Sequence, residues 1–293
     1  MRRRLLLAAL AALAVPARAT EPIRVVASFS ILADMVRQIG GEAVAVTALV
    51  PPDGDAHTYE PRPSDLLAIQ AASLVVTNGL GLDAWMDRLI GGAGGSAVRA
   101  IASARVTPRR MSEGGRQVLD PHAWQDPRNG VLYARTIIEG LIRAAPDRAD
   151  LLRAQGERYL AAIQETDAWT LRTLAPVPPA KRKIITSHDA FGYFGARYGI
   201  EFHAAQGIDT DAEPSARDIA RLAAQIRREH IRAVFVENMT DPRIARALAR
   251  EAGAVVGGTV YSDALSPPGG PAATYLAMFH HNATLFAAAM AEN

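Results

Sequence analysis

The sequence predicts an α/β protein with two lobes, each a parallel sheet flanked by helices, joined by a long rigid backbone helix. Three observations predict this class. Short apolar runs alternate with helical patterns at the spacing of β–α–β units. Two such series occur, one on each side of a long stretch without proline. The apolar share of 49% and the charged share of 21% are those of a folded globular chain.

The first series begins with an apolar run that reads as a buried strand. Pro51 and Pro52 stop the second strand, and Ser64 is a candidate N-cap for the helix that follows. The expected elements are a strand at residues 23–29, a helix at 31–40, a strand at 44–50, a helix at 65–72 and a strand at 74–77.

Two helical stretches follow the first series. Asp126 and Pro127 form an N-cap with proline at the first helical position. After Pro146, residues 147–174 hold no proline, which allows a helix roughly 40 Å long at 1.5 Å per residue. A helix of that length exceeds the usual span in a small domain, so it could cross from one lobe to the other.

The second series repeats the pattern of the first. Asp241 and Pro242 are expected to cap one helix, and Gly253 to end it. The expected strands are at residues 183–186, 200–202, 233–236 and 254–260, and the expected helices at 215–229, 242–252 and 271–290. The predicted organisation is therefore an N-terminal lobe at 20–146, a connecting helix at 147–175 and a C-terminal lobe at 176–293.

Residues 1–19 have the three parts of a cleavable secretory signal peptide. Three arginines follow Met1, residues 5–15 are an unbroken apolar run, and Ala17-Arg18-Ala19 is a small-x-small cleavage site. The run is shorter than the ~20 apolar residues that span a bilayer. We therefore expect a mature protein that is periplasmic.

Net charge and cysteine content exclude several function classes. The formal charge of +2 suggests an anionic partner, but residues 1–19 carry four arginines and no acidic residue. Without them the chain has 28 basic and 30 acidic residues, a charge of −2, so no nucleic-acid partner is expected. The absence of cysteine excludes disulfides, thiolate metal sites, thiol nucleophiles and a lipid anchor on cysteine.

Three of the seven histidines share one kind of position. His57 lies between a predicted strand and a predicted helix, His122 lies four residues before the Asp126 cap, and His188 directly follows a strand. Ligands of open α/β sheets bind beyond the carboxyl ends of the strands. Imidazole is the commonest ligand of zinc and its neighbours, so these three side chains are candidate metal ligands in a cleft between the lobes.

A closed metal site needs a fourth ligand, and Asp263 is the best candidate because it lies just beyond a strand. Glu60 is the second candidate, although its exposed loop favours an indirect role. Glu237 also follows a strand, but it could serve the Asp241-Pro242 turn. The other histidines fit ordinary structural positions, with His203 near the rim of the cleft; they are His203, His230, His280 and His281.

The chain resembles the zinc- and manganese-binding group of ABC-transporter solute-binding proteins. The resemblance covers essentially the whole mature chain and rests on five ordered motifs, which are His57-x-Tyr-Glu-Pro, Asp120-Pro121-His122-x-Trp124, Ser187-His188-Asp189-Ala190-Phe191-x-Tyr193, Ala212-Glu213-Pro214-Ser215 and Tyr261-Ser262-Asp263-Ala264-Leu265-Ser266. It implies one metal in the cleft, with His57 and His122 contributed by the first lobe and His188 and Asp263 by the second.

The residue at the third ligand position favours zinc. Manganese-binding relatives tend to have a carboxylate there, whereas this chain has His188. Three nitrogens and one oxygen suit tetrahedral Zn²⁺, while Mn²⁺ prefers oxygen-rich sites of higher coordination. Many zinc-binding members also carry a His-rich loop before the second motif, but residues 107–118 contain no histidine. Auxiliary zinc capture by such a loop is therefore not expected.

The sequence-based hypothesis is a monomeric periplasmic protein that captures Zn²⁺ and delivers it to the membrane permease of an ABC importer. It is not expected to be an enzyme or to be anchored in the membrane. The first alternative is a manganese- or iron-binding protein of the same family. The others are a secreted zinc hydrolase, which needs an open fourth metal position and a general base, a binding protein for an iron chelate or cobalamin, and a surface adhesin.

Overall fold

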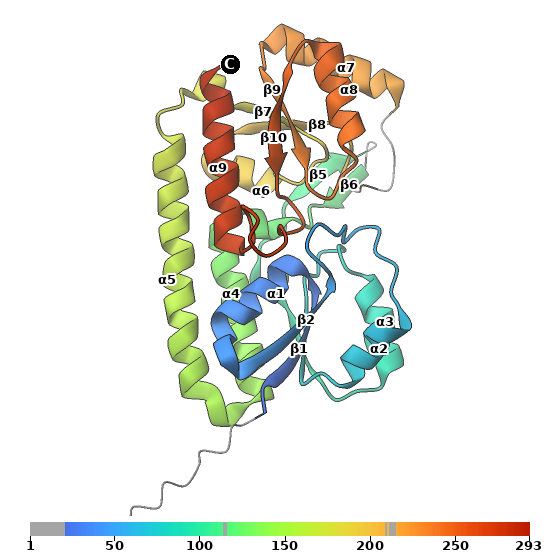
Figure 1. The fold of residues 1–293 in the computed structure, drawn as a ribbon, viewed down its shortest axis with the longest axis vertical. Helices are drawn as coiled ribbons and strands as arrows, with labels where there is room; N and C mark the ends of the chain where they lie inside the picture. Colours follow the sequence, from blue (N-terminus) through green and yellow to red (C-terminus); the bar gives the residue numbers. More distant parts are fainter. Residues whose placement is uncertain (1–20, 114–115, 209, 211–214) are drawn as a thin grey trace, which may run out of the picture.

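The computed structural model describes residues 21–113, 116–208, 210 and 215–293. The predicted signal peptide at 1–19 and residues 212–214 of the fourth motif lie outside the described residues. The described chain forms two lobes, each built on a four-stranded parallel sheet (Figure 1). This confirms the predicted fold class. In the part of the chain that the structure describes, no helix is both long and apolar enough to cross a membrane.

The sheet of the first lobe has the strand order β2-β1-β3-β4. Its central strand β1 (Ile23–Phe29) is apolar at five of seven positions and buried at six, because sheet neighbours and helices cover it. The other strands are β2 (Val44–Val50), β3 (Leu74–Thr77) and β4 (Val98–Ile101), and the helices between them are α1 (Ser30–Gly40), α2 (Pro63–Gln70) and α3 (Trp85–Ala93).

The start of α2 differs from the prediction. The helix begins at Pro63 rather than after a Ser64 cap, and Arg62 occupies the N-cap position. The carboxylate of Asp65 accepts a hydrogen bond from the backbone N–H of Arg62 at 2.7 Å. Proline at the first helical position and an acidic residue at the third outweigh the local preference of serine for the cap.

The sheet of the second lobe has the strand order β10-β9-β7-β8. Asp241 caps α8 by accepting from the backbone N–H of Arg243 at 2.9 Å, and Gly253 ends that helix in the left-handed conformation, as predicted. The strands are β7 (Lys183–Thr186), β8 (Glu201–Ala204), β9 (Ala233–Glu237) and β10 (Val255–Val260), and the helices are α6 (Gly192–Tyr198), α7 (Ala216–Glu229) and α8 (Pro242–Ala252).

Three long helices join the lobes on one side of the molecule (Figure 1). They are α4 (Pro127–Ala144), α5 (Ala149–Leu174) and α9 (Tyr275–Ala291), and Asp126 caps α4 as predicted. Figure 1 shows α5 running along the lower lobe and on beside the upper lobe, where α9 lies next to it. One apolar core continues from the first lobe through these helices into the second, which opposes large hinge motions.

A β-hairpin that the sequence analysis did not predict stands between the lobes. Its strands are β5 (Arg110–Glu113) and β6 (Arg116–Leu119), paired antiparallel. At its base the backbone N–H of Asp120 donates to the carbonyl of Arg109 at 3.0 Å. The hairpin therefore leads directly into the segment that carries His122.

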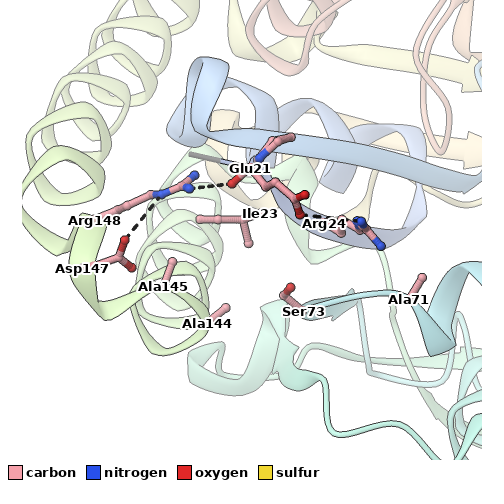
Figure 2. A pocket seen from close by; sticks show the side chains of 10 residues that line it. Glu21, Ile23, Arg24, Ala71, Ser73, Ala144, Ala145, Asp147 and Arg148 are labelled. Atoms are coloured by element: carbon pink, nitrogen blue, oxygen red, sulfur yellow. Dashed lines mark hydrogen bonds and ion pairs between the residues drawn. The ribbon is translucent and has the colours of Figure 1, made fainter. Parts of the chain in front are cut away.

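A hollow of about 400 Å³ lies at the far end of the first lobe (Figure 2). Ile23 and Ser73, at the starts of β1 and β3, line it, and Arg148 crosses it to the carbonyl of Glu21 at 2.5 Å. It therefore opens at the amino ends of the strands, the opposite edge from the histidines. Ligands of such sheets bind at the carboxyl ends, so we do not assign function to this hollow.

Candidate metal centre

The four predicted ligands come together between the lobes. His57 lies in the loop between β2 and α2, His122 precedes the short helix before α4, His188 follows β7, and Asp263 follows β10. One ligand atom from each lies within 4.8 Å of the others. Each lies in a segment that follows a strand or precedes a helix, and the four residues fit a site with three imidazoles and one carboxylate.

The donor atoms have the spacing of a tetrahedral site. Oδ2 of Asp263 lies 3.1 Å from Nε2 of His57, 3.1 Å from Nε2 of His188 and 3.6 Å from Nε2 of His122. The Nε2 atoms of His57 and His122 are 3.3 Å apart. A tetrahedron with bonds of 2.0–2.1 Å has edges of about 3.4 Å. The measured separations scatter around that value.

The cluster is screened from solvent. The side chains of His122, His188 and Asp263 are fully buried, and that of His57 is 3% exposed. Oδ1 of Asp263 has no hydrogen-bond partner among the described residues. A buried carboxylate oxygen without a partner is costly unless a cation balances it, so the donor set fits a metal ion.

Buried carboxylates hold two of the imidazoles from behind. Oε2 of Glu237 lies 2.6 Å from Nδ1 of His188, and Oε1 accepts from the backbone N–H of that histidine at 2.7 Å. Oδ1 of Asp120 lies 2.9 Å from Nδ1 of His122. Such contacts fix the tautomer, so that Nε2 faces the metal. The alternative that the Glu237 side chain serves the Asp241 turn is wrong, since only its backbone carbonyl contacts the turn, at Thr240.

The charges in the cluster shift its pKa values strongly. Burial lowers the pKa of His122, but the carboxylates of Asp263 and Asp120 outweigh burial and raise this pKa to about 9. For His188, burial is likewise outweighed by Glu237 and Asp263, so its pKa is well above the usual value. Burial raises the pKa of Asp263, but His122 and His188 hold it well below its ordinary range. In the absence of a cation, the site therefore retains protons that a metal must displace.

A small hollow leads to the cluster from outside. It measures about 170 Å³ and is lined by His57, by the loop at Leu80, by Val118 and Leu119 of β6, and by Ile208. It lies beside His57, whose side chain is the one in the cluster that is not fully buried. An ion rather than an organic molecule matches this size.

The remaining candidates lie outside the cluster. Glu60 is exposed in the loop beyond His57. His230 ends α7 in the left-handed conformation, and His280 packs on the ring of Trp169. His203 lies on β8, paired with Ile185, rather than at the cleft.

His203 belongs to a second group of ligand-type side chains, with Glu201 and Glu229. Nε2 of His203 lies 3.0 Å from Oε1 of Glu201. The ammonium of Lys183 lies 2.7 Å from Glu229 and 3.9 Å from Glu201, so a cation already balances these carboxylates. This arrangement is a surface ion-pair group, and we do not assign a metal to it.

Residues 25–289 match the profile of a protein family described as the periplasmic zinc-uptake complex component A. A curated relative, the manganese-binding lipoprotein MntA of Halalkalibacterium halodurans, is 33% identical over 93% of this chain and 90% of its own length. The iron-binding protein YfeA of Yersinia pestis is 28% identical over 90% of this chain and 85% of its own.

A solved structure has the same architecture. The periplasmic zinc-binding protein TroA of Treponema pallidum superposes with a TM-score of 0.87 at 29% identity, over 92% of this chain and 99% of that structure. Proteins named for manganese, iron and zinc are thus similar to this chain over at least 90% of its length.

Proposed function

The chain belongs to the family of periplasmic zinc-uptake complex component A proteins, and from that premise we propose that it binds Zn²⁺ in the periplasm and delivers it to an ABC importer. Members of this family are extracytoplasmic substrate-binding proteins of metal ABC transporters, not enzymes. The observation that carries the choice of zinc is the donor set. Three imidazole nitrogens and one carboxylate oxygen suit tetrahedral Zn²⁺, and four of the six separations between these atoms are 3.1–3.6 Å.

The ligands of the ion are His57, His122, His188 and Asp263 under this proposal. Each imidazole binds through Nε2, since Nδ1 of His122 and of His188 faces a carboxylate. Asp263 supplies the oxygen and, with Glu237 and Asp120, the negative charge that balances the cation. Because nearby carboxylates raise the pKa of His122 and of His188, zinc binding at these two imidazoles releases protons.

The remaining parts of the proposal follow from the family and the sequence. Residues 1–19 are a cleavable signal peptide, and the mature chain acts as a monomer without an anchor. It is divided into an N-terminal lobe at 20–146, the connecting helix at 147–175 and a C-terminal lobe at 176–293. Its partner is the membrane permease, and the continuous core favours release through small loop movements rather than wide lobe opening.

A manganese-binding protein is the second candidate function. It is favoured by the 33% identity to a relative named for manganese. Mn²⁺ prefers more oxygen ligands and a higher coordination number than these four residues supply. A zinc hydrolase is disfavoured, because Oδ2 of Asp263 lies where a catalytic site keeps an open position for water.

The test is metal competition on the mature chain after removal of all metal. We expect one Zn²⁺ per chain and displacement of bound Mn²⁺ by Zn²⁺. His188→Ala should abolish stoichiometric binding, whereas His203→Ala, a change of histidine outside the cluster, should leave it intact. Absence of zinc binding, or equal stoichiometry in the two variants, would contradict the proposal; retention of Mn²⁺ against Zn²⁺ would favour the second candidate.

A further inference from the structure

The carboxylate behind His122 contacts a partly exposed side chain, whereas the pair formed by His188 and its carboxylate is fully buried. Glu237 and His188 are both fully buried. Asp120 is also fully buried, but its second oxygen, Oδ2, accepts a hydrogen bond from Nη1 of Arg109 at 3.0 Å, and the Arg109 side chain is 38% exposed. A chain of contacts therefore runs from the surface through Arg109 and Asp120 to the metal-facing imidazole.

Both carboxylate oxygens of Asp120 have hydrogen-bond partners. Oδ1 accepts from the backbone N–H of His122 at 3.0 Å and lies 2.9 Å from Nδ1 of the same residue. Among the described residues, Arg109 is the hydrogen-bond donor to Oδ2. Because Arg109 holds Oδ2, it restrains the rotation of the carboxylate group and so the placement of Oδ1 against the imidazole of His122.

The second lobe holds Arg109 in place. The backbone N–H of Arg109 donates to the hydroxyl of Tyr193 on α6 at 2.7 Å, and that hydroxyl donates to the carbonyl of Asp120 at 3.4 Å. Gly192 begins α6 directly against this pair. A Cβ at Gly192 would overlap the Arg109 guanidinium and lie 2.6 Å from Oδ2 of Asp120. The guanidinium therefore occupies space that only glycine leaves free.

From this geometry we propose that Arg109 is a positioning residue that sets the affinity and residence time of the metal ion through Asp120 and His122. The inference rests on the proposed function, because it assigns His122 as a ligand. Removing Arg109 frees the Asp120 carboxylate to rotate and leaves a buried charge without its cation. Loss of a group that orients a metal-bound histidine typically weakens metal binding by about 10-fold or more.

The experiment measures zinc affinity by competition and zinc release after addition of excess chelator, using the mature chain. Arg109→Ala should weaken binding and speed release by about 10-fold. Arg109→Lys keeps the charge and should restore part of both. Arg110→Ala removes the neighbouring exposed arginine and should behave as wild type. The thermal unfolding temperature of each metal-free variant is measured in parallel.

Two further variants separate positioning from folding. Tyr193→Phe removes both hydroxyl bonds while it keeps the ring, and should also speed release. Gly192→Ala places a methyl group against Arg109 and should also speed zinc release. In Gly91→Ala the added methyl group lies in open space, so release should stay at the wild-type rate.

The outcomes are distinct. If wild type binds no zinc, the proposed function fails and this inference with it. If wild type binds zinc and Arg109→Ala releases it at the rate of Arg110→Ala, the inference alone is wrong. It is also wrong if Arg109→Ala lowers the metal-free unfolding temperature and Arg109→Lys restores neither affinity nor release rate, because the role of Arg109 is then structural. Faster release at an unchanged metal-free unfolding temperature, partly reversed by lysine, supports it.

Discussion

Oε2 of Glu237 lies 2.6 Å from Nδ1 of His188, with both side chains fully buried. The two residues stand 49 positions apart, at the ends of the neighbouring strands β9 and β7. A buried carboxylate against Nδ1 directs Nε2 to the metal and makes the imidazole a stronger donor. Under the proposed function, Glu237 therefore supports a ligand although it does not itself face the ion.

Replacing Glu237 by glutamine should weaken zinc binding by about 10–100-fold, because it removes the charge while keeping the shape of the side chain. Isothermal titration in competition with a chelator measures the change. Glu229→Gln is the matched control, since Glu229 contacts Lys183 in the surface ion-pair group away from the cleft. Equal affinities for the two variants would show that Glu237 has no influence on the ion.

The pKa of His122 makes the stability of the metal-free protein depend on pH. Its folded pKa is about 9, above the ~6.5 of an unfolded chain, so the folded state binds the proton more tightly. The stabilisation is complete below about pH 6.5 and is lost as the pH rises through 9, with a ceiling of about 3 kcal/mol. The pKa of Asp263 lies well below its ordinary range, so its ionised carboxylate stabilises the folded state above that range. This stabilisation is lost as the pH falls below the ordinary aspartate range.

Thermal unfolding of the metal-free and zinc-loaded protein at pH 6, 7.5 and 9 checks this expectation. The gap between the two unfolding temperatures should widen with pH, because zinc competes with fewer protons. Metal-free His122→Asn should show a flatter pH dependence over this window than wild type. A gap that stays constant from pH 6 to 9 would mean that His122 does not carry the proton.

Local patterns in the sequence predicted much of the fold. Buried strands such as β1 and the proline-led helices after Asp126 and Asp241 are specified by apolar runs and caps within a few residues. The spatial strand order and the hairpin β5–β6 depend on packing between distant segments, so no local pattern predicts them. The predicted start of α2 was wrong for a local reason, because Pro63 and Asp65 favour a helix that begins one residue before the Ser64 cap.

The candidate site was likewise only partly predictable from the sequence. His57, His122, His188 and Asp263 could be found because each lies next to a strand end or a helix cap, and one edge of each sheet gathers such positions. The supporting residues could not be found. Glu237 had an equally plausible local role in a turn, and Arg109 is one of 30 arginines without a distinguishing neighbour. Their roles depend on partners brought together by the fold.

The loop that carries His57 is attached to the second lobe by Asp55. Oδ1 of Asp55 accepts from the backbone N–H of His57 at 2.9 Å, and Oδ2 accepts from the hydroxyl of Thr210 at 2.6 Å. Thr210→Val removes the link between the lobes and keeps the local bond to His57. We expect zinc release several-fold faster than wild type, since the one partly accessible ligand can then move away more easily.

Stopped-flow mixing with a chelator measures that release, and Thr284→Val is the control. The hydroxyl of Thr284 donates to the backbone carbonyl of His280 within α9, so its loss should not reach the His57 loop. Identical release from the two threonine variants would assign the retention of zinc to the ligands alone.

The start of α9 is held by two side chains, one from each lobe. Thr274 accepts from the backbone N–H of Ala277 at 3.1 Å, and Asp34 of α1 accepts from the backbone N–H of Tyr275 at 2.8 Å. Both satisfy backbone donors that the first turn of a helix leaves without partners. Asp34 is buried, so its loss costs more than that of an ordinary cap.

We expect Thr274→Ala to lower the free energy of unfolding by about 1 kcal/mol and Asp34→Ala by about 1–3 kcal/mol. Asp34 joins α1 to α9, and both caps act on the first turn of α9. If their effects are coupled, the loss of unfolding free energy in the double variant should differ from the sum of the two single losses. Chemical denaturation of the metal-free chain measures all three. Neither change touches a ligand, so zinc stoichiometry should stay at one. A fall in stoichiometry with unchanged stability would show instead that the α1–α9 junction acts on the metal centre rather than on the fold.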